Sequence, residues 1–378
     1  MKDRLNGLKS FLNRRSFMKK GLAAASAATV GAGLLGSGPL AFGQDEESEP
    51  TQGDIAILRF LAAAEIIESD LWLQYSELGG VQDSEVQGVN GGNPLYMAAL
   101  QLLDMDMSQY VHDNTDDEFS HMNFLNQYLM LKGAQPVNLN PFRRLPSSTA
   151  PGARQIKRLT NLMQLSVNTS WWTRYRSTTN PDLGATFPDA VPSLNVGEHT
   201  AIPRSMADLT GSTVANPSDH LKAIAFTAGF HFAFIEQGGT SLYAAMAQKV
   251  TSLEVLRIVV SIGGSEIMHF QTWQDKAGNA TPLTDVDPVT GATVTFTDLA
   301  MNQPETLQAN LIMPEPCQFL NPNKLPPCAI IRPTATQGVA KGAVEAFTRD
   351  GLFIGQKDDF FDFLGELAEK ADAARRGF

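Results

Sequence analysis

Two Glu-x-x-His tetrads are the residues of this chain best suited to chemistry, namely Glu118-Phe-Ser-His121 and Glu266-Ile-Met-His269. With 17 Glu and 6 His in 378 residues, chance predicts roughly 0.3 such pairs. Both tetrads lie in apolar stretches with helical spacing, and residues three apart share one face of a helix. Because a buried carboxylate and imidazole are costly without a cation, each tetrad predicts a pair of metal ligands.

Two further glutamates lie in similar surroundings. Glu65 follows the apolar run of residues 55–64 and precedes two isoleucines, and Glu236 ends the apolar run of residues 230–235. A buried carboxylate without a partner costs several kcal/mol, and a shared metal pair removes that cost. Two helices that supply Glu-x-x-His and two that supply one Glu are typical of two-metal sites in four-helix bundles. The alternative is that these polar residues lie on exposed helix faces by coincidence.

Three stretches resemble the ferritin-like superfamily, and more narrowly its branch that includes plant desiccation-related proteins. They are residues 64–72, residues 117–134, and residues 234–269, and the resemblance covers about residues 54–275. It implies an all-α fold, with a ferritin-like four-helix bundle, a long crossover between helices two and three, an irregular insertion and a C-terminal helix.

The same resemblance implies a set of metal ligands from four helices. These are Glu65, Glu118, His121, Glu236, Glu266 and His269. Glu118 and Glu266 are expected to bridge two iron or manganese ions, since hard carboxylates with imidazoles suit these metals. The role of Glu68 stays open, because it either replaces or supplements Glu65 or faces solvent.

The expected function is that of an exported protein in iron or oxygen/peroxide redox chemistry, ferroxidase- or catalase-like, with a metal ion or a small-molecule oxidant as its partner. One alternative is a non-enzymatic, desiccation-stress-related or structural periplasmic protein, whose metal site is structural or vestigial. A hydroxylating oxidase ranks third, because the sequence offers no residues that would recognise an organic substrate. The sequence leaves the metal, the reaction and the substrate open.

The N-terminus predicts export. Residues 13–19, Asn-Arg-Arg-Ser-Phe-Met-Lys, match the twin-arginine consensus, and an Ala/Gly-rich stretch of residues 21–40 follows. Ala41 and Gly43 suit signal peptidase, so cleavage is expected after Gly43. The twin-arginine translocase would then deliver the protein to the periplasm or outside the cell. A membrane anchor is disfavoured, because the stretch holds five glycines and Pro39.

Charge limits the partners of the exported protein. Residues 1–43 hold seven Lys/Arg and one Asp, so their removal changes the formal net charge from −11 to −17. Such an acidic chain argues against nucleic acid or an anionic membrane as partner. Cys317 and Cys328 form either a disulfide or two free thiols, and the sequence does not decide between them.

Spacing and turn signals divide the chain into five parts. They are a signal peptide (1–43), a linker (44–53), the bundle (54–275), a Pro/Thr-rich irregular segment (276–342) and a C-terminal helical extension (343–378) that covers the bundle or mediates homo-oligomer formation. Within the bundle the expected helices span about 54–78, 93–132, 218–250 and 252–274. The crossover is expected to be helical at 153–175, and a hairpin is expected near 289–296.

Two smaller features bear on the site. The pairs Gly238-Gly239 and Gly263-Gly264 stand two or three residues from a predicted ligand. They indicate close helix approach, room beside the metals, or a helix break. His112 and His231 are each predicted to point away from the ligands on their helices.

Overall fold

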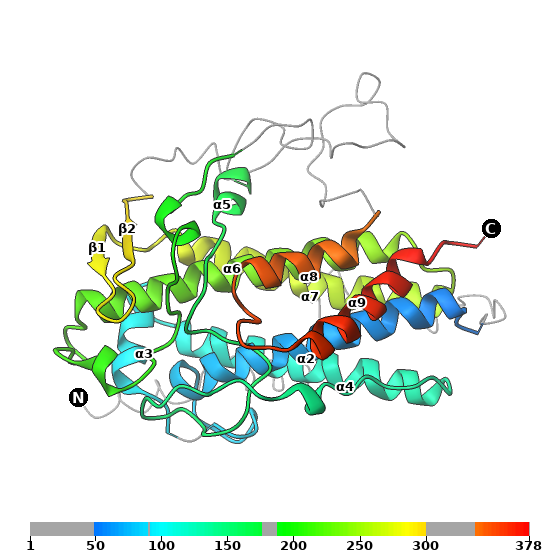
Figure 1. The fold of residues 1–378 in the computed structure, drawn as a ribbon, viewed down its shortest axis with the longest axis horizontal. Helices are drawn as coiled ribbons and strands as arrows, with labels where there is room; N and C mark the ends of the chain where they lie inside the picture. Colours follow the sequence, from blue (N-terminus) through cyan, green and yellow to red (C-terminus); the bar gives the residue numbers. More distant parts are fainter. Residues whose placement is uncertain (1–48, 90, 176–186, 300–336, 378) are drawn as a thin grey trace, which may run out of the picture. The chain divides into compact units, whose positions relative to one another are not determined.

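The computed structural model describes residues 49–89, 91–175, 187–299 and 337–377. The described residues form eight α-helices and one two-stranded sheet, so the prediction of an all-α fold is confirmed (Figure 1). The predicted signal peptide and both cysteines lie outside the described residues.

Four long helices make up most of the structure. They are α2 (Gln52–Gly79), α4 (Met107–Leu131), α6 (Asp219–Ala247) and α7 (Leu253–Ala277). Helix α2 packs along α4, and α6 packs along α7 (Figure 1).

Local capping fixes where these helices begin. Thr51 and Asp54 form a reciprocal capping box at the start of α2. Asp54 also accepts hydrogen bonds from the backbone N–H groups of Thr251 (2.7 Å) and Ser252 (3.2 Å). One buried carboxylate therefore joins the start of α2 to the start of α7.

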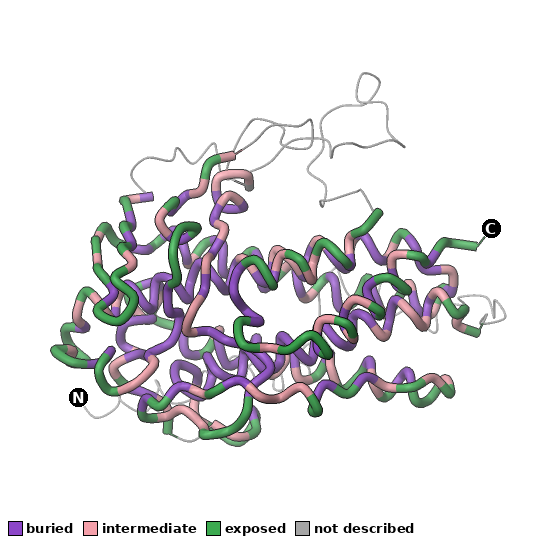
Figure 2. Tube along the Cα trace, in the orientation of Figure 1, coloured by how far each residue is buried: buried purple, intermediate pink, exposed green. Residues whose placement is uncertain are grey.

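Burial differs between the four helices. Helix α2 is buried almost continuously from Ile57 to its end, and most of α6 is buried as well (Figure 2). Helices α4 and α7 keep exposed faces that carry residues such as Phe124 and Met268. Among the described residues, no helix combines the length and the apolarity needed to cross a membrane.

The second predicted helix is two helices. Residues 93–132 contain α3 (Pro94–Leu100) and α4, and a turn lies between them. Asp104 accepts a hydrogen bond from the Asp106 backbone N–H at 2.8 Å. An aspartate that binds the backbone two residues ahead stabilises a turn in competition with a helix, so the prediction of one unbroken helix was wrong.

The predicted crossover helix is also mostly wrong. Only α5 (Ser170–Tyr175) is helical, and the residues before it are extended and bound to remote segments. Arg158 pairs with Leu145 as an isolated bridge, and Leu165 pairs with His199. The leucines of this segment are buried at helical spacing, but the segment is not a helix, because its backbone groups form hydrogen bonds with residues far away in the chain.

The C-terminal part contains two helices, α8 (Val339–Arg349) and α9 (Asp358–Ala373), where a single one was expected. Gly351 (φ +86°) and Gly355 (φ +95°) take left-handed conformations in the turn between them. Helix α9 packs on α2 (Figure 1). The hairpin is longer than predicted, since β1 (Leu283–Val286) pairs antiparallel with β2 (Thr293–Phe296).

His231 predicts acid sensitivity of this fold. It is fully buried in α6, and a hydrogen bond of 2.7 Å joins its Nδ1 to the Tyr75 hydroxyl. Burial lowers the pKa of His231 to about 3. Below about pH 6.5, His231 is protonated in the unfolded chain but stays neutral in the folded chain. The free energy of unfolding therefore falls as the pH drops from about 6.5 towards 3.

We expect His231 to contribute a loss of roughly 3 kcal/mol in the free energy of unfolding between pH 7 and pH 4. The His231→Asn variant places an amide group near the position of Nδ1, where it can bond Tyr75, but does not titrate, so it should lose less stability over this range. Urea unfolding of both metal-free proteins at the two pH values measures the difference. An identical pH dependence would contradict this role of His231.

Candidate metal centre

The structure brings all six predicted ligands into two overlapping groups. Each group offers ligand atoms that all lie within 4.8 Å of one another. The first group is Glu65, Glu118, His121 and Glu266, and the second is Glu118, Glu236, Glu266 and His269. Glu118 and Glu266 belong to both groups, as expected of bridging carboxylates.

His121 is the imidazole of the first group. Its Nδ1 lies 3.4 Å from Glu65 Oε2, 3.3 Å from Glu118 Oε2 and 3.5 Å from Glu266 Oε1. The other oxygen of Glu65 accepts a hydrogen bond from the Tyr243 hydroxyl. Helices α2, α4 and α7 therefore direct three carboxylates at one ring nitrogen.

His269 has the corresponding place in the second group. Its Nδ1 lies 3.3 Å from Glu118 Oε1 and 3.2 Å from Glu236 Oε2. Its Nε2 donates a hydrogen bond to Asp117 Oδ2 at 3.0 Å. Because that carboxylate accepts the Nε2 proton, Nδ1 is the nitrogen that would offer a lone pair to a metal ion once its own proton is lost.

Asn114 is a supporting residue that the sequence analysis missed. Its Nδ2 donates to Glu118 Oε1 (2.8 Å) and to Glu236 Oε1 (2.9 Å). Its Oδ1 in turn accepts a hydrogen bond from Trp273 Nε1 at 2.7 Å. Asn114 stands one helical turn before Glu118, and this spacing was the only signal in the sequence. An asparagine one turn from a glutamate is too common to indicate a site by itself. The contact to Glu236 depends on how α4 faces α6.

The protonation of the cluster reflects a shortage of positive charge. Burial raises the pKa of Glu65 to about 7, and it raises the pKa of Glu266 well above the usual range. Burial also opposes ionisation of Glu118, but hydrogen bonds and the charges of His121 and His269 outweigh it and hold the pKa of Glu118 below its usual range. Burial lowers and the neighbouring carboxylates raise the pKa of His121, which rises to about 10. Protons thus supply the positive charge in the metal-free cluster.

The donor set fits divalent cations. Glu65 Oε2 and both oxygens of Glu266 are buried and accept no hydrogen bond. Buried carboxylate oxygens without donors are costly, and metal ions would satisfy them. Four carboxylates with two imidazoles match the hard ligands that iron and manganese accept in proteins.

Glycine permits the close approach of the two ligand-bearing helices α6 and α7. A Cβ atom on Gly239 would lie 2.2 Å from Glu266 Oε2, and one on Gly263 would lie 2.9 Å from Tyr243 Cβ. Both helices continue through their glycine pairs. The alternative of a helix break was therefore wrong, and the tight contacts expected of these pairs are found at Gly239 and Gly263 but not at Gly238 or Gly264.

Glu68 and His112 were also considered as ligands in the sequence analysis. Glu68 is only 3% exposed, so it does not face solvent, and burial together with the charge of Glu65 raises its pKa well above the usual range. His112 stands apart from the six residues, as predicted. It is buried beside two carboxylates of the preceding loop, with Nε2 3.7 Å from Asp83 Oδ1 and 3.4 Å from Glu85 Oε2.

The cluster is reached most easily from the side of its imidazoles. The four glutamates of the two groups have no exposed surface, whereas His121 is 9% exposed and His269 is 8% exposed. The exposed surface of the cluster therefore lies at α4 and α7, which carry these two residues. No protein-family model, curated protein or solved structure matches this chain.

Proposed function

We propose that this chain is an exported, ferritin-like protein that binds two iron or manganese ions and acts in redox chemistry of iron, oxygen or peroxide. The observation that carries the proposal is the sharing of Glu118 and Glu266 between two groups of buried ligands. Four long helices that each contribute to this cluster support the ferritin-like four-helix bundle. The twin-arginine sequence supports export.

The residues of the chain have distinct tasks in this proposal. Glu65 and His121 would hold one ion, Glu236 and His269 would hold the other, and the two shared glutamates would hold both. When bound, two such ions would supply the redox chemistry for a small oxygen-containing reactant. Asn114 fixes the positions of two carboxylates by hydrogen bonds, and the apolar walls of α2 and α6 exclude bulk water.

Metal analysis of the protein purified without chelators tests the proposal. We expect about two iron or manganese ions per chain, and none in the Glu118→Ala/His121→Ala/Glu266→Ala/His269→Ala variant. The control is Glu345→Ala, which removes an exposed carboxylate of α8 and should keep both ions. Fe(II) oxidation and peroxide consumption by the loaded protein then distinguish the reactions.

The opposite outcome has an equally definite meaning. A wild-type protein that stays folded, contains no metal and cannot be loaded with Fe(II) or Mn(II) would contradict the metal centre. A protein that holds two ions but reacts with neither oxygen nor peroxide would leave a structural metal site and contradict the redox function.

A further inference from the structure

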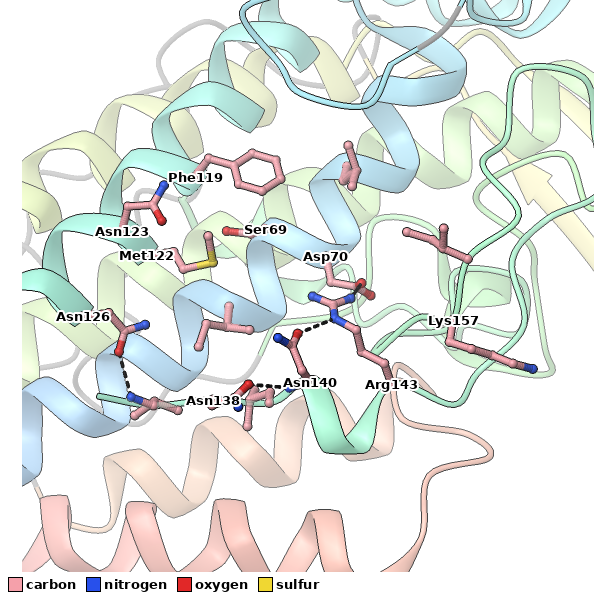
Figure 3. Close-up of a pocket in the computed structure, with 15 residues that line it drawn as sticks. Ser69, Asp70, Phe119, Met122, Asn123, Asn126, Asn138, Asn140, Arg143 and Lys157 are labelled. Atoms are coloured by element: carbon pink, nitrogen blue, oxygen red, sulfur yellow. Dashed lines mark hydrogen bonds and ion pairs between the residues drawn. The ribbon is translucent and has the colours of Figure 1, made fainter. Parts of the chain in front are cut away.

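A cavity of about 490 Å³ lies outside the metal centre, between α2, α4 and the chain that follows α4 (Figure 3). None of the six predicted ligands lines it. Its apolar wall includes Ile66 and Leu73 of α2 and Met122 of α4. Asparagine and basic side chains complete its lining, namely Asn123, Asn126, Asn138, Asn140, Arg143 and Lys157.

Three of these asparagines have their oxygen atoms occupied. Asn126 Oδ1 accepts from the Val137 backbone N–H (2.7 Å), and Asn138 Oδ1 accepts from the Asn140 backbone N–H (3.0 Å). Asn140 Oδ1 accepts from Arg143 Nε at 3.1 Å (Figure 3). In the part of the chain that the structure describes, their amide nitrogens have no acceptor. Since an amide NH₂ group can only donate, these side chains offer donors to a ligand.

The one acidic residue of the lining is already neutralised. Asp70 is 2% exposed and forms an ion pair with Arg143 through Oδ1. Its Oδ2 accepts from the backbone N–H groups of Leu159 (2.9 Å) and Thr160 (3.0 Å). Asp70 therefore holds Arg143 in place without providing an acceptor for a ligand.

The lining of the cavity carries one positive charge in excess, because Asp70, Arg143 and Lys157 are its charged residues. Residues 119–181 contain eight Lys/Arg and no Asp or Glu, but carboxylates of other segments pair with Lys132, Arg143, Arg144 and Arg158. In the cavity lining, the exposed Lys157 adds a positive charge to the Asp70–Arg143 pair. Donor groups and excess positive charge together favour a ligand that is rich in acceptor oxygens and negatively charged.

We propose that this cavity binds a small organic anion of about monosaccharide size, with a carboxylate or phosphate group near Arg143 and Lys157. Its remaining oxygens accept hydrogen bonds from the asparagine amides, and its less polar face packs on Ile66 and Met122. An inorganic anion alone would leave most of the 490 Å³ unfilled. A neutral sugar fits less well, because its hydroxyl groups also need acceptors, and three of the four lining asparagines already use their oxygen in the protein's own hydrogen bonds.

Calorimetric titration of the full-length, metal-free protein tests the proposal with glucose 6-phosphate, glucuronate and glucose. We expect at least one of the two anions to bind at least about tenfold more tightly than glucose, and its affinity to fall as salt is added. The anion that binds more tightly identifies the charged group. Because the protein is metal-free and the metal ligands are unchanged, this result is independent of the proposed redox function.

Isosteric variants locate the binding. Asn126→Asp and Asn138→Asp keep the oxygen that accepts a backbone hydrogen bond and replace the donor nitrogen with a carboxylate oxygen. Each should weaken anion binding at least about tenfold, because a donor becomes a negative charge. Gln127→Glu makes the same change in charge at the next, exposed position of α4, which does not line the cavity, and should have little effect.

Lys157→Gln is a second test at an exposed residue, where folding is not at risk, and it should also weaken binding. Absence of binding by both anions up to about 10 mM would overturn the proposal. Equal affinity for glucose and the two anions would overturn it too, as would an equal loss in Gln127→Glu and Asn126→Asp.

Discussion

The Glu266→Gln variant should lose both metal ions and yet remain as stable as the wild type when metal is absent. Glu266 belongs to both ligand groups, so its loss should affect both ions. In the metal-free protein its two oxygens accept no hydrogen bond, and burial beside other carboxylates raises its pKa well above the usual range. A neutral glutamine of the same shape should therefore change the free energy of unfolding of the metal-free protein by no more than about 1 kcal/mol.

The effect should appear when metal is added. An ion at about 1,000 times its dissociation constant stabilises a folded protein by about 4 kcal/mol, and this gain should vanish in Glu266→Gln. Urea unfolding with and without Mn(II), together with metal analysis, measures both quantities. Glu236→Gln is the matched control, because Glu236 belongs to one group and its loss should leave about one ion. Equal metal loss in the two variants would contradict the bridging role of Glu266.

The Gly239→Ala variant should weaken metal binding at least about tenfold while the protein stays folded. The added Cβ atom would lie 2.2 Å from Glu266 Oε2 and 3.1 Å from its Cδ, which is too close for either contact. The carboxylate is the end of a rotatable side chain, so it can move away without disturbing α6 or α7. The movement would take a shared ligand out of both groups.

Gly238→Ala makes the same chemical change one residue earlier in α6. Its added Cβ atom would meet nothing closer than Phe347 Cε1 at 4.0 Å. It should keep both ions and gain up to about 1 kcal/mol of stability, because alanine is the better helix former. Metal titration and thermal unfolding of the two variants provide the comparison. If both alanines reduced metal affinity equally, backbone flexibility at the glycine pair would explain the loss better than contact with Glu266.

The local pattern of the sequence carried much of the information on the candidate site. A Glu and a His three residues apart share a helix face whatever the rest of the fold does, so the pairs Glu118/His121 and Glu266/His269 could be predicted without tertiary structure. The start of α2 also depends only on neighbouring residues, since Thr51 and Asp54, three residues apart, cap the helix. Hydrophobic periodicity gave wrong predictions of helices where backbone groups form hydrogen bonds with residues far away in the chain. The extended crossover, which includes Leu159 bound to Asp70, is the clearest example.

The sequence by itself determined that the chain is mainly α-helical and which residues could act as ligands, because helical periodicity and i,i+3 spacing are properties of neighbouring residues. Only the tertiary structure decided which carboxylates are shared, that Asn114 connects Glu118 to Glu236, and that Gly239 faces Glu266. It also decided that three asparagines of the cavity use their oxygens within the protein and leave their amide nitrogens as donors. These features depend on how separate helices and loops meet in space, and contacts between residues far apart in the chain leave no periodic pattern in a single sequence.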